Sequence, residues 1–531
     1  MSVSPMPEQR DRLPLWVTVL FVVFLALRAV DLTNLSQAKK GGRLSQSLAG
    51  SVDEKTMSST LATNWAAKTA FVASFGQPGK SESDRKSLQE ALQEAESLQK
   101  DTHNVPASAR RVIILRALLH LPLLATTKNG LDPKQAFQLP ALAGLPPEDQ
   151  TRFLAEGRLW AEVALGPHLT PAQTDAAAAQ LRALPNIRWW RYPALSVLYG
   201  SQGNKSAAAR YTQEAQSHAL KTLGPMILMG LFWGFLGLGG IVLLFYQLIR
   251  WLNNRQSDPN TPLLPNPWLT LPETVPLAER RLRAGDLMGV FVLYLLMPDA
   301  LGWLLAGFGV PHLFHFSGLL TGYKHQILAL PASQHVAAVV ILEFFGYLLS
   351  AAIPIGLLIA IARRRGASLG DELGWNRRRL GQNLLYGVGG YAIGLPLLML
   401  AGLAGPQIFR HMPAPSNPAI PLLANASSFW IQALLVLLAT VAAPLTEELL
   451  FRGVFYNAAK LRAGVWPAII MTGLVFGFAH PVGLGEMLPL AVLGGVFAWM
   501  AETRKSLVPS MLGHCMQNTM ATMMLLLALA G

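Results

Sequence analysis

Long apolar segments alternate with shorter polar ones along most of this chain. A helix that crosses a membrane needs about 20 mostly apolar residues. Segments near this length occur close to the N-terminus and through the second half of the chain, where the last four follow one another closely. The pattern predicts an all-α, polytopic membrane protein with about nine transmembrane helices, near residues 14–30, 224–249, 285–307, 336–361, 381–403, 428–450, 465–480, 487–502 and 507–530.

Residues 31–220 interrupt this pattern. They are polar and rich in Ala, Gln and Glu, and stretches such as SLQEALQEAESLQKD have the pattern of a helix. The stretch 192–220 indicates two amphipathic helices around a Gly-Asn turn. It faintly resembles a tetratricopeptide hairpin, although no second copy follows at a fixed period. We therefore expect a helical domain, tetratricopeptide-like or unclassified, that is available to a protein partner.

Together the two patterns divide the chain into five parts. We expect a signal-anchor helix at 1–30, the helical domain at 31–220, a transmembrane helix at 221–250, a cytoplasmic Pro-rich linker at 251–284, and a membrane core at 285–531 whose motifs lie in 428–531.

The positions of Lys and Arg predict how the chain crosses the membrane, because these residues are enriched in cytoplasmic loops. Arg10 and Arg12 place the N-terminus inside, so residues 31–220 are expected outside. The triple-arginine runs at 363–365 and 377–379 flank an inside loop. We expect a multi-pass protein of the bacterial cytoplasmic (inner) membrane with an extracytoplasmic domain.

Composition supports a membrane protein and argues against a nucleic-acid partner. Of 531 residues, 52% are hydrophobic and 14% are charged, against roughly 25% charged in soluble proteins. The net charge of +13 comes from basic residues beside apolar segments, without the aromatic-interleaved basic runs of RNA- or DNA-binding proteins. The single cysteine excludes an intrachain disulfide and a cysteine-cluster metal site.

Ionisable residues inside apolar segments are the candidates for chemistry, because burying them in a membrane costs free energy. In the last hundred residues they form three motifs, EELLFR (447–452), FGFAH (476–480) and HCMQN (514–518). Each motif holds a pair at i, i+4, which shares a helix face. We expect Glu448 to pair with Arg452, which leaves Glu447 free, and Phe476 to cover one side of His480.

A carboxylate, two imidazoles and a carboxamide suffice to hydrolyse an amide with water. Glu447 can act as the general base, helped by His480. His514 and Asn518 can donate hydrogen bonds to the developing oxyanion. Alternatively, Glu447 or Glu448 joins the two histidines in a three-ligand zinc site with water in the fourth position. Both readings predict hydrolysis of a peptide or protein substrate without a covalent intermediate.

The three motifs resemble the pattern EExxxR, FxxxH and HxxxN on successive helices of a known family. This family comprises the type II CAAX prenyl endopeptidases and the bacteriocin-processing or immunity proteins, also called the CPBP or ABI intramembrane proteases. All three motifs match in order and without a substitution, and the likeness covers roughly residues 380–531.

The resemblance implies an intramembrane endopeptidase with Glu447 as catalytic base, His480 assisting, and His514 and Asn518 on the oxyanion side. The glutamate–arginine pair is implied to be structural. We favour a metal-free glutamate mechanism, because the chain lacks the HExxH pair of zinc proteases; zinc remains the alternative, and no other cofactor is expected. The competing interpretation is a non-catalytic immunity or scaffold protein of the same fold that recruits partners through residues 31–220.

Other polar residues in apolar surroundings have weaker support as site residues. Glu343 is expected to line a cavity around the active site or to make a helix contact. His312 and His315 are expected at the membrane interface, and Cys515 is expected to contact lipid or neighbouring helices.

One geometric difficulty follows from the predicted helix ends. If a helix ends near residue 450 and the next spans 465–480, Glu447 and His480 lie about 24 Å apart. They meet only if the first helix continues past 450, if the intervening turn lies lower, or if Pro444 bends the chain.

Overall fold

The computed structural model of this chain describes two compact units. It covers residues 14–25, 64–72, 169–184, 188–257, 279–305, 332–410, 428–480 and 482–529, with shorter pieces within 82–93, 114–119, 275–276 and 422–426 and at 159. The core unit comprises Met1–Gly50 and Leu231–Met523, and the polar unit comprises Ser51–Gly230 and Met524–Gly531. All regular elements in these covered stretches are helices, which confirms the all-α class for them.

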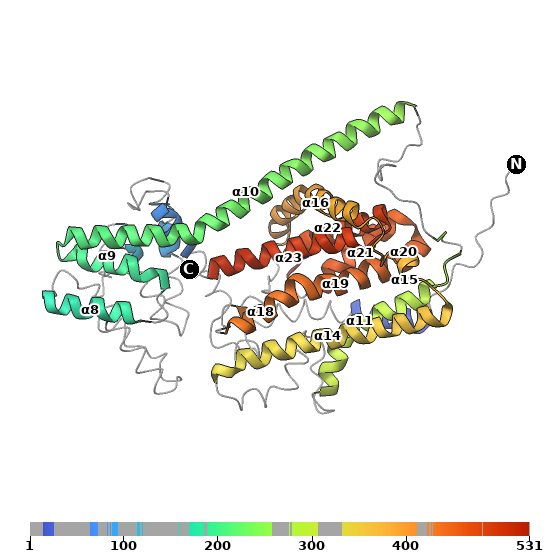
Figure 1. Cartoon of the computed structure of the whole chain (residues 1–531), viewed down its shortest axis with the longest axis horizontal. Helices are drawn as coiled ribbons and strands as arrows, with labels where there is room; N and C mark the ends of the chain where they lie inside the picture. The colour runs from blue at the N-terminus through green and yellow to red at the C-terminus, as the bar shows by residue number, and fades with distance from the viewer. Residues whose placement is uncertain are drawn as a thin grey trace. The chain divides into compact units, whose positions relative to one another are not determined.

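The polar unit contains α8 (Pro171–Ala183), η4 (Arg188–Trp190), α9 (Arg191–Ser201) and the first part of α10 (Lys205–Ser257) (Figure 1). Thr170 and Gln173 begin α8 with a capping box, in which each side chain accepts the other residue's backbone N–H. Between α9 and α10 the chain turns at Gly203, whose φ of 73° suits glycine. Two helices therefore flank the Gly-Asn turn, as expected for 192–220.

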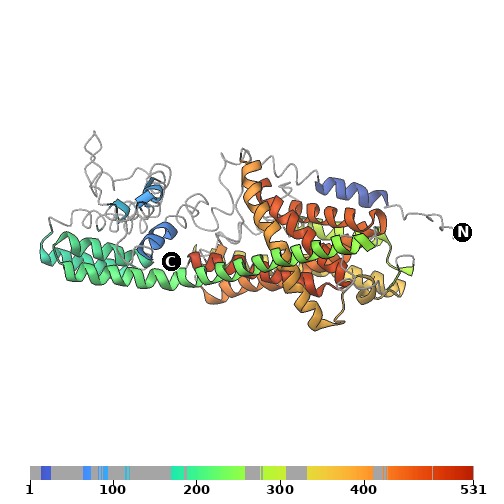
Figure 2. The same cartoon turned by 90° about the horizontal axis from the view of Figure 1, so that it is seen from above.

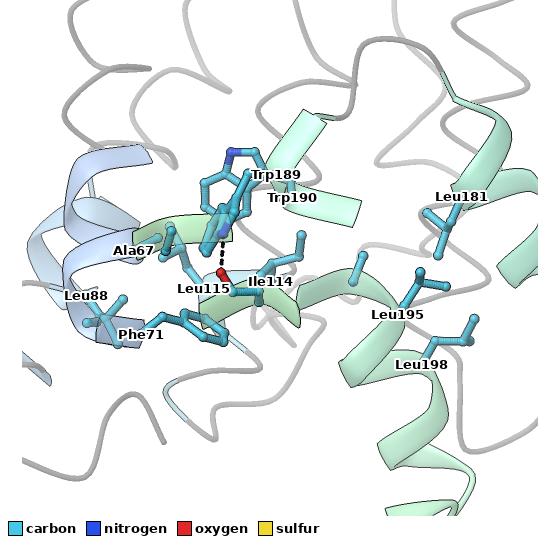
Figure 3. Close-up of a cluster of buried hydrophobic side chains, with 14 of the residues drawn as sticks. Ala67, Phe71, Leu88, Ile114, Leu115, Leu181, Trp189, Trp190, Leu195 and Leu198 are labelled. Carbon is cyan, nitrogen blue, oxygen red and sulfur yellow. Dashed lines mark hydrogen bonds between the residues drawn. The ribbon is translucent and has the colours of Figure 1, made fainter. Parts of the chain in front are cut away.

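Two tryptophans organise the core of the polar unit (Figure 3). Trp189 donates its ring N–H to the Ala215 carbonyl at 2.8 Å, and Trp190 donates to Asn64 Oδ1 at 2.6 Å. The apolar side chains around them include Ala67, Phe71, Leu88, Ile114, Leu115, Leu195 and Leu198. Because the buried indole N–H groups are satisfied, the rings contribute burial without an unpaired donor.

Five described helices are long and apolar enough to cross a membrane, namely Lys205–Asn254, Val336–Arg365, Leu380–Ile408, Phe429–Ala463 and Leu484–Arg504. Shorter apolar helices occupy Leu15–Leu25, Ala284–Pro298 and Val465–Ala479. With α23 (Val508–Leu529), a helix lies in each of the nine predicted segments. The expected number of nine spans is not confirmed, because the other four helices are not described as both long enough and apolar enough to cross a membrane.

The domain boundary expected at residue 220 lies inside a continuous helix. α10 runs unbroken from Lys205 to Ser257, although Gly224 and Pro225 lie where its polar part meets the apolar segment. The expected linker at 251–284 begins inside α10 and ends where α11 (Ala284–Leu305) starts. Its Pro-rich centre, 258–274, lies outside the described residues.

Helices of the core unit pack in close pairs (Figure 1, and from above in Figure 2). α11 lies against α14 (Ala332–Arg365), and α22 (Leu484–Arg504) lies against both α16 (Leu380–Ile408) and α21 (Val465–Ala479). A Cβ atom on Gly473 would lie 2.5 Å from the Ala491 carbonyl oxygen of α22, so the two backbones touch. Small residues permit such close approach between apolar helices.

One long helix carries the first motif. Its consecutive parts are α18 (Phe429–Leu437), η6 (Leu438–Ala442), α19 (Ala443–Glu447), η7 (Glu448–Phe455) and α20 (Tyr456–Ala463). η6 and η7 are π-helical. Pro444 has no N–H to donate and its ring displaces the preceding turn, which explains the wider winding just before it.

The expected end of this helix near residue 450 is wrong. The helix continues through Gly453 to Ala463, and Gly464 ends it with a φ of 82°. Glu447 therefore lies in the middle of a long helix rather than at its end.

Candidate active site

Glu448 and Arg452 form a fully buried ion pair on η7. Arg452 Nη1 lies 2.8 Å from Glu448 Oε1, and both side chains are 0% exposed. Arg452 Nη2 also donates to the Gly494 carbonyl on α22 at 3.0 Å, and its guanidinium lies 4.3 Å from the Phe476 ring centroid. Because each charge has a partner, the pair can remain ionised away from water.

His514 of α23 lies between the two adjacent glutamates. Its Nδ1 lies 2.9 Å from Glu448 Oε1, and its Nε2 lies 3.9 Å from Glu447 Oε2. The Glu448 carboxylate is ionised by its pairing with Arg452 and can only accept a hydrogen bond. The Nδ1 of His514 therefore carries a proton and donates the hydrogen bond to Glu448. The Nε2 atom is thereby directed at Glu447, with the ring held by Phe476 and Phe497 at centroid distances of 5.7 and 5.2 Å.

His480 approaches the same carboxylate oxygen from the C-terminal end of α21. Its Nδ1 donates to the Phe476 carbonyl at 2.7 Å, and its Nε2 lies 4.0 Å from Glu447 Oε2. The Phe476 ring, which is fully buried, lies 4.6 Å from the imidazole and covers one side of it. A backbone carbonyl can only accept, so the Nε2 of a neutral His480 presents a lone pair to Glu447.

Asn518 lies one helical turn after His514 and makes a different contact. Its Nδ2 donates to the Ala439 carbonyl of η6 at 2.8 Å. This contact binds α23 to the π-helical turn that precedes Pro444. One Nδ2 hydrogen is used here, and the second remains for another acceptor. The structure shows no hydrogen bond from Asn518 to the other three expected catalytic residues.

Three helices thus bring Glu447, His480 and His514 together, although their motifs are separated in sequence. The expected separation of about 24 Å between Glu447 and His480 does not occur. The long helix continues past Glu447, so this residue lies at the depth reached by the end of α21. Glu447 Oε2 is buried and accepts no hydrogen bond from the protein.

A tyrosine that the motif analysis did not identify reaches the other oxygen of Glu447. The Tyr347 hydroxyl lies 3.5 Å from Glu447 Oε1 and 2.6 Å from Thr446 Oγ1. Tyr347 follows Glu343 by one turn on α14, so the two side chains share a helix face. The presence of Glu343 inside an apolar segment was therefore the sequence feature that could have drawn attention to Tyr347. Glu343 itself is partly buried, and the covered stretches supply it with no hydrogen-bond partner.

The candidate zinc ligands lie farther apart in this arrangement than in an assembled zinc site. Nitrogen and oxygen ligands lie about 2.0–2.2 Å from zinc, which places the ligand atoms of a tetrahedral site roughly 3.3 Å apart. The separations between Glu447 Oε2 and the two Nε2 atoms, 3.9 and 4.0 Å, are longer. Within the described ranges, no group of three His, Cys, Asp or Glu side chains is spaced to hold a metal ion.

The remaining candidates lie apart from this constellation. Cys515 is a free, partly buried thiol on α23, next in sequence to His514. His312 and His315 lie outside the described residues.

Comparisons with known proteins match the segment that carries these residues. Residues 429–520 match the family model described as Type II CAAX prenyl endopeptidase Rce1-like. "Putative membrane peptidase YdiL" of Bacillus subtilis (strain 168) is 27% identical over 92 residues, which are 17% of this chain and 37% of that protein. The chain thus covers little more than a third of that relative. No solved structure matches.

The matched segment begins at the first residue of α18 and ends within α23, so it contains all three motifs. The comparisons therefore confirm, for residues 429–520, the resemblance to the type II CAAX prenyl endopeptidase family.

Proposed function

We propose that this chain is an intramembrane endopeptidase that hydrolyses a peptide bond with water activated by Glu447 and His480. The observation that carries the proposal is the convergence of two imidazole Nε2 atoms on Glu447 Oε2, at 3.9 and 4.0 Å. Polar atoms at such separations are suited to bridging by one water molecule. Such a water lies within reach of both a carboxylate base and an imidazole acceptor.

In this mechanism Glu447 takes one proton from the water, and the hydroxide attacks the scissile carbonyl carbon. Asn518 donates its second Nδ2 hydrogen to the oxyanion, and a doubly protonated His514 donates through Nε2, because its Nδ1–H already goes to Glu448. When the carbon–nitrogen bond breaks, Glu447 returns its proton to the leaving amine. The products are a carboxylic acid and an amine, and proton transfer between them gives a carboxylate and an ammonium group. No step of this proposal requires a metal.

The substrate class is a protein or peptide that reaches the membrane. The family name points to prenylated C-terminal sequences, and we treat prenylation as one substrate to be tried among others. Residues 31–220 serve in this proposal as a docking domain for a protein partner.

The test is a cleavage assay with the purified full-length protein and a peptide library. We expect Glu447→Gln to abolish cleavage, because the amide cannot take a proton, while Glu214→Gln on the polar part of α10 leaves it unchanged. Cleavage that survives Glu447→Gln contradicts the assignment and favours a non-catalytic scaffold. Loss of cleavage with a chelator and its return with zinc contradict the metal-free mechanism.

We further propose a bacterial inner-membrane location with residues 31–220 outside the cytoplasm. The support is the distribution of arginine at helix ends, such as Arg363–Arg365 at the end of α14. Single cysteines at exposed Ala176 and exposed Arg364, in a Cys515→Ser background, test this in intact cells. An impermeant thiol reagent should label Ala176→Cys and leave Arg364→Cys unlabelled, and the reverse pattern contradicts the orientation.

A further inference from the structure

A cavity of about 450 Å³ lies in the core unit between the helix Leu15–Leu25, α11 and α14. Its lining includes none of the three motifs, so it is separate from the candidate active site. The volume falls within the usual range of ligand pockets. The lining is polar at one end of the helices and apolar along their length. Such a lining is complementary to an amphiphilic ligand, which has a polar head and an apolar chain.

Three charged residues line the polar end of this cavity, and their charges do not cancel. Arg365 at the end of α14 pairs with Asp286 on α11 at 2.7 Å. Arg283, just before α11, is exposed and has no ion-pair partner in the described part of the chain. The three side chains therefore leave one positive charge at the cavity, and this charge is complementary to an anionic group.

Large apolar side chains line the rest of the cavity. Leu293 and Leu296 contribute from α11, and Leu357 and Ile361 from α14. Leu357 is 41% exposed and Trp16 is 57% exposed, so the apolar part of the lining is accessible from outside the protein. Tryptophan is enriched where a membrane meets water. Its position on the cavity wall fits a ligand with its head at that level and its chain in the hydrocarbon.

The cavity wall is built by close contact between helices. A Cβ atom on Gly285 would lie 3.0 Å from Pro14 Cδ, and one on Gly289 would lie 3.0 Å from the Trp16 ring. These two glycines, four residues apart, allow the N-terminal helix to lie directly on α11. The opposite side of α11 contacts the Glu447-bearing helix through Phe291, which lies 4.6 Å from Phe455.

We propose that this cavity binds an anionic phospholipid. The phosphate of the headgroup pairs with Arg283, and an acyl chain lies against the leucines of α11 and α14. Basic pockets between membrane helices recognise anionic headgroups in this way. The proposal goes beyond the proteolytic function and does not depend on it, because it uses no residue of the active site.

The test is a lipid titration of the delipidated, purified full-length protein, followed by native mass spectrometry. Phosphatidylglycerol and phosphatidylcholine with identical acyl chains are compared, with glycerol 3-phosphate as the headgroup alone. Arg283→Gln removes the unpaired charge, and Arg364→Gln is the matched control in the same arginine-rich region but outside the lining. Leu357→Trp fills the apolar part, with Leu349→Trp on the same helix as its control.

We expect phosphatidylglycerol to bind more tightly than phosphatidylcholine. Arg283→Gln should weaken phosphatidylglycerol binding about fivefold and leave phosphatidylcholine binding unchanged, while Leu357→Trp should weaken both. Equal losses with Arg364→Gln and Arg283→Gln overturn the proposal, since they indicate a diffuse basic surface. Binding that survives Leu357→Trp, or equal binding of glycerol 3-phosphate, also overturns it. Thermal unfolding of each variant verifies that the fold is retained.

Discussion

His514 Nδ1 donates a hydrogen bond to Glu448 Oε1 at 2.9 Å. This contact links Glu448, the partner of Arg452, to the candidate active site. The same histidine presents Nε2 to Glu447, the other member of the glutamate pair. Glu448 therefore does more than neutralise Arg452: it also sets which nitrogen of His514 faces Glu447. A hydrogen bond at one ring nitrogen of an imidazole fixes the orientation of the ring, and with it the direction of the other nitrogen.

The buried ion pair gives a prediction about stability. Glu448→Gln leaves the Arg452 guanidinium buried without its counter-charge, and we expect the free energy of unfolding to fall by about 3–5 kcal/mol. Arg452→Met should cost a similar amount. The double variant should lose clearly less than the sum of the two, because no unpaired charge remains. Thermal unfolding in detergent measures all three, and additive losses would contradict the pairing.

Asn518 gives a prediction that separates catalysis from anchoring. Asn518→Ala removes a donor to the oxyanion, and we expect kcat to fall about 100- to 1,000-fold with little change in KM. Thr519→Ala, at the exposed neighbouring position, is the control. A lower melting temperature with kcat unchanged would show that Asn518 only binds α23 to the Ala439 carbonyl.

Tyr347 is expected to position the catalytic carboxylate. Tyr347→Phe keeps the ring and removes the hydroxyl beside Glu447 Oε1. We expect kcat to fall about tenfold, the order of a hydrogen bond to a charged group, and KM to stay constant, because the contacts of this hydroxyl are to Glu447 and Thr446. Tyr246→Phe, exposed on α10, serves as the control. A raised KM with an unchanged kcat would instead assign Tyr347 to substrate binding.

The close contact between α21 and α22 predicts different effects for two glycines. Gly473→Ala places a methyl group 2.5 Å from the Ala491 carbonyl, so the helices must separate and the melting temperature should fall. Gly495→Ala, whose nearest neighbours lie 3.9 Å away, should be neutral or stabilising because alanine favours the helix. Similar melting temperatures for the two variants would contradict the contact.

Much of the site could be predicted from local sequence pattern. Helical spacing alone pairs Glu448 with Arg452, places Phe476 over His480 and separates Glu447 from its neighbour. Each of these depends only on residues within one turn of a helix, whose geometry is the same in any fold. The nine apolar segments were visible for the same reason, since hydropathy is a local property of the chain.

The relationships between helices required the tertiary structure. The sequence alone suggested that Glu447 lay near a helix end, since hydropathy falls after residue 450 although the helix continues to Ala463. It gave no signal that Tyr347 and Thr446 meet, or that Arg283 faces a cavity, because those contacts join segments far apart in the chain. Which residues form motifs was determined by the sequence, and which atoms face one another was decided by packing, because only packing sets the depth and rotation of each helix.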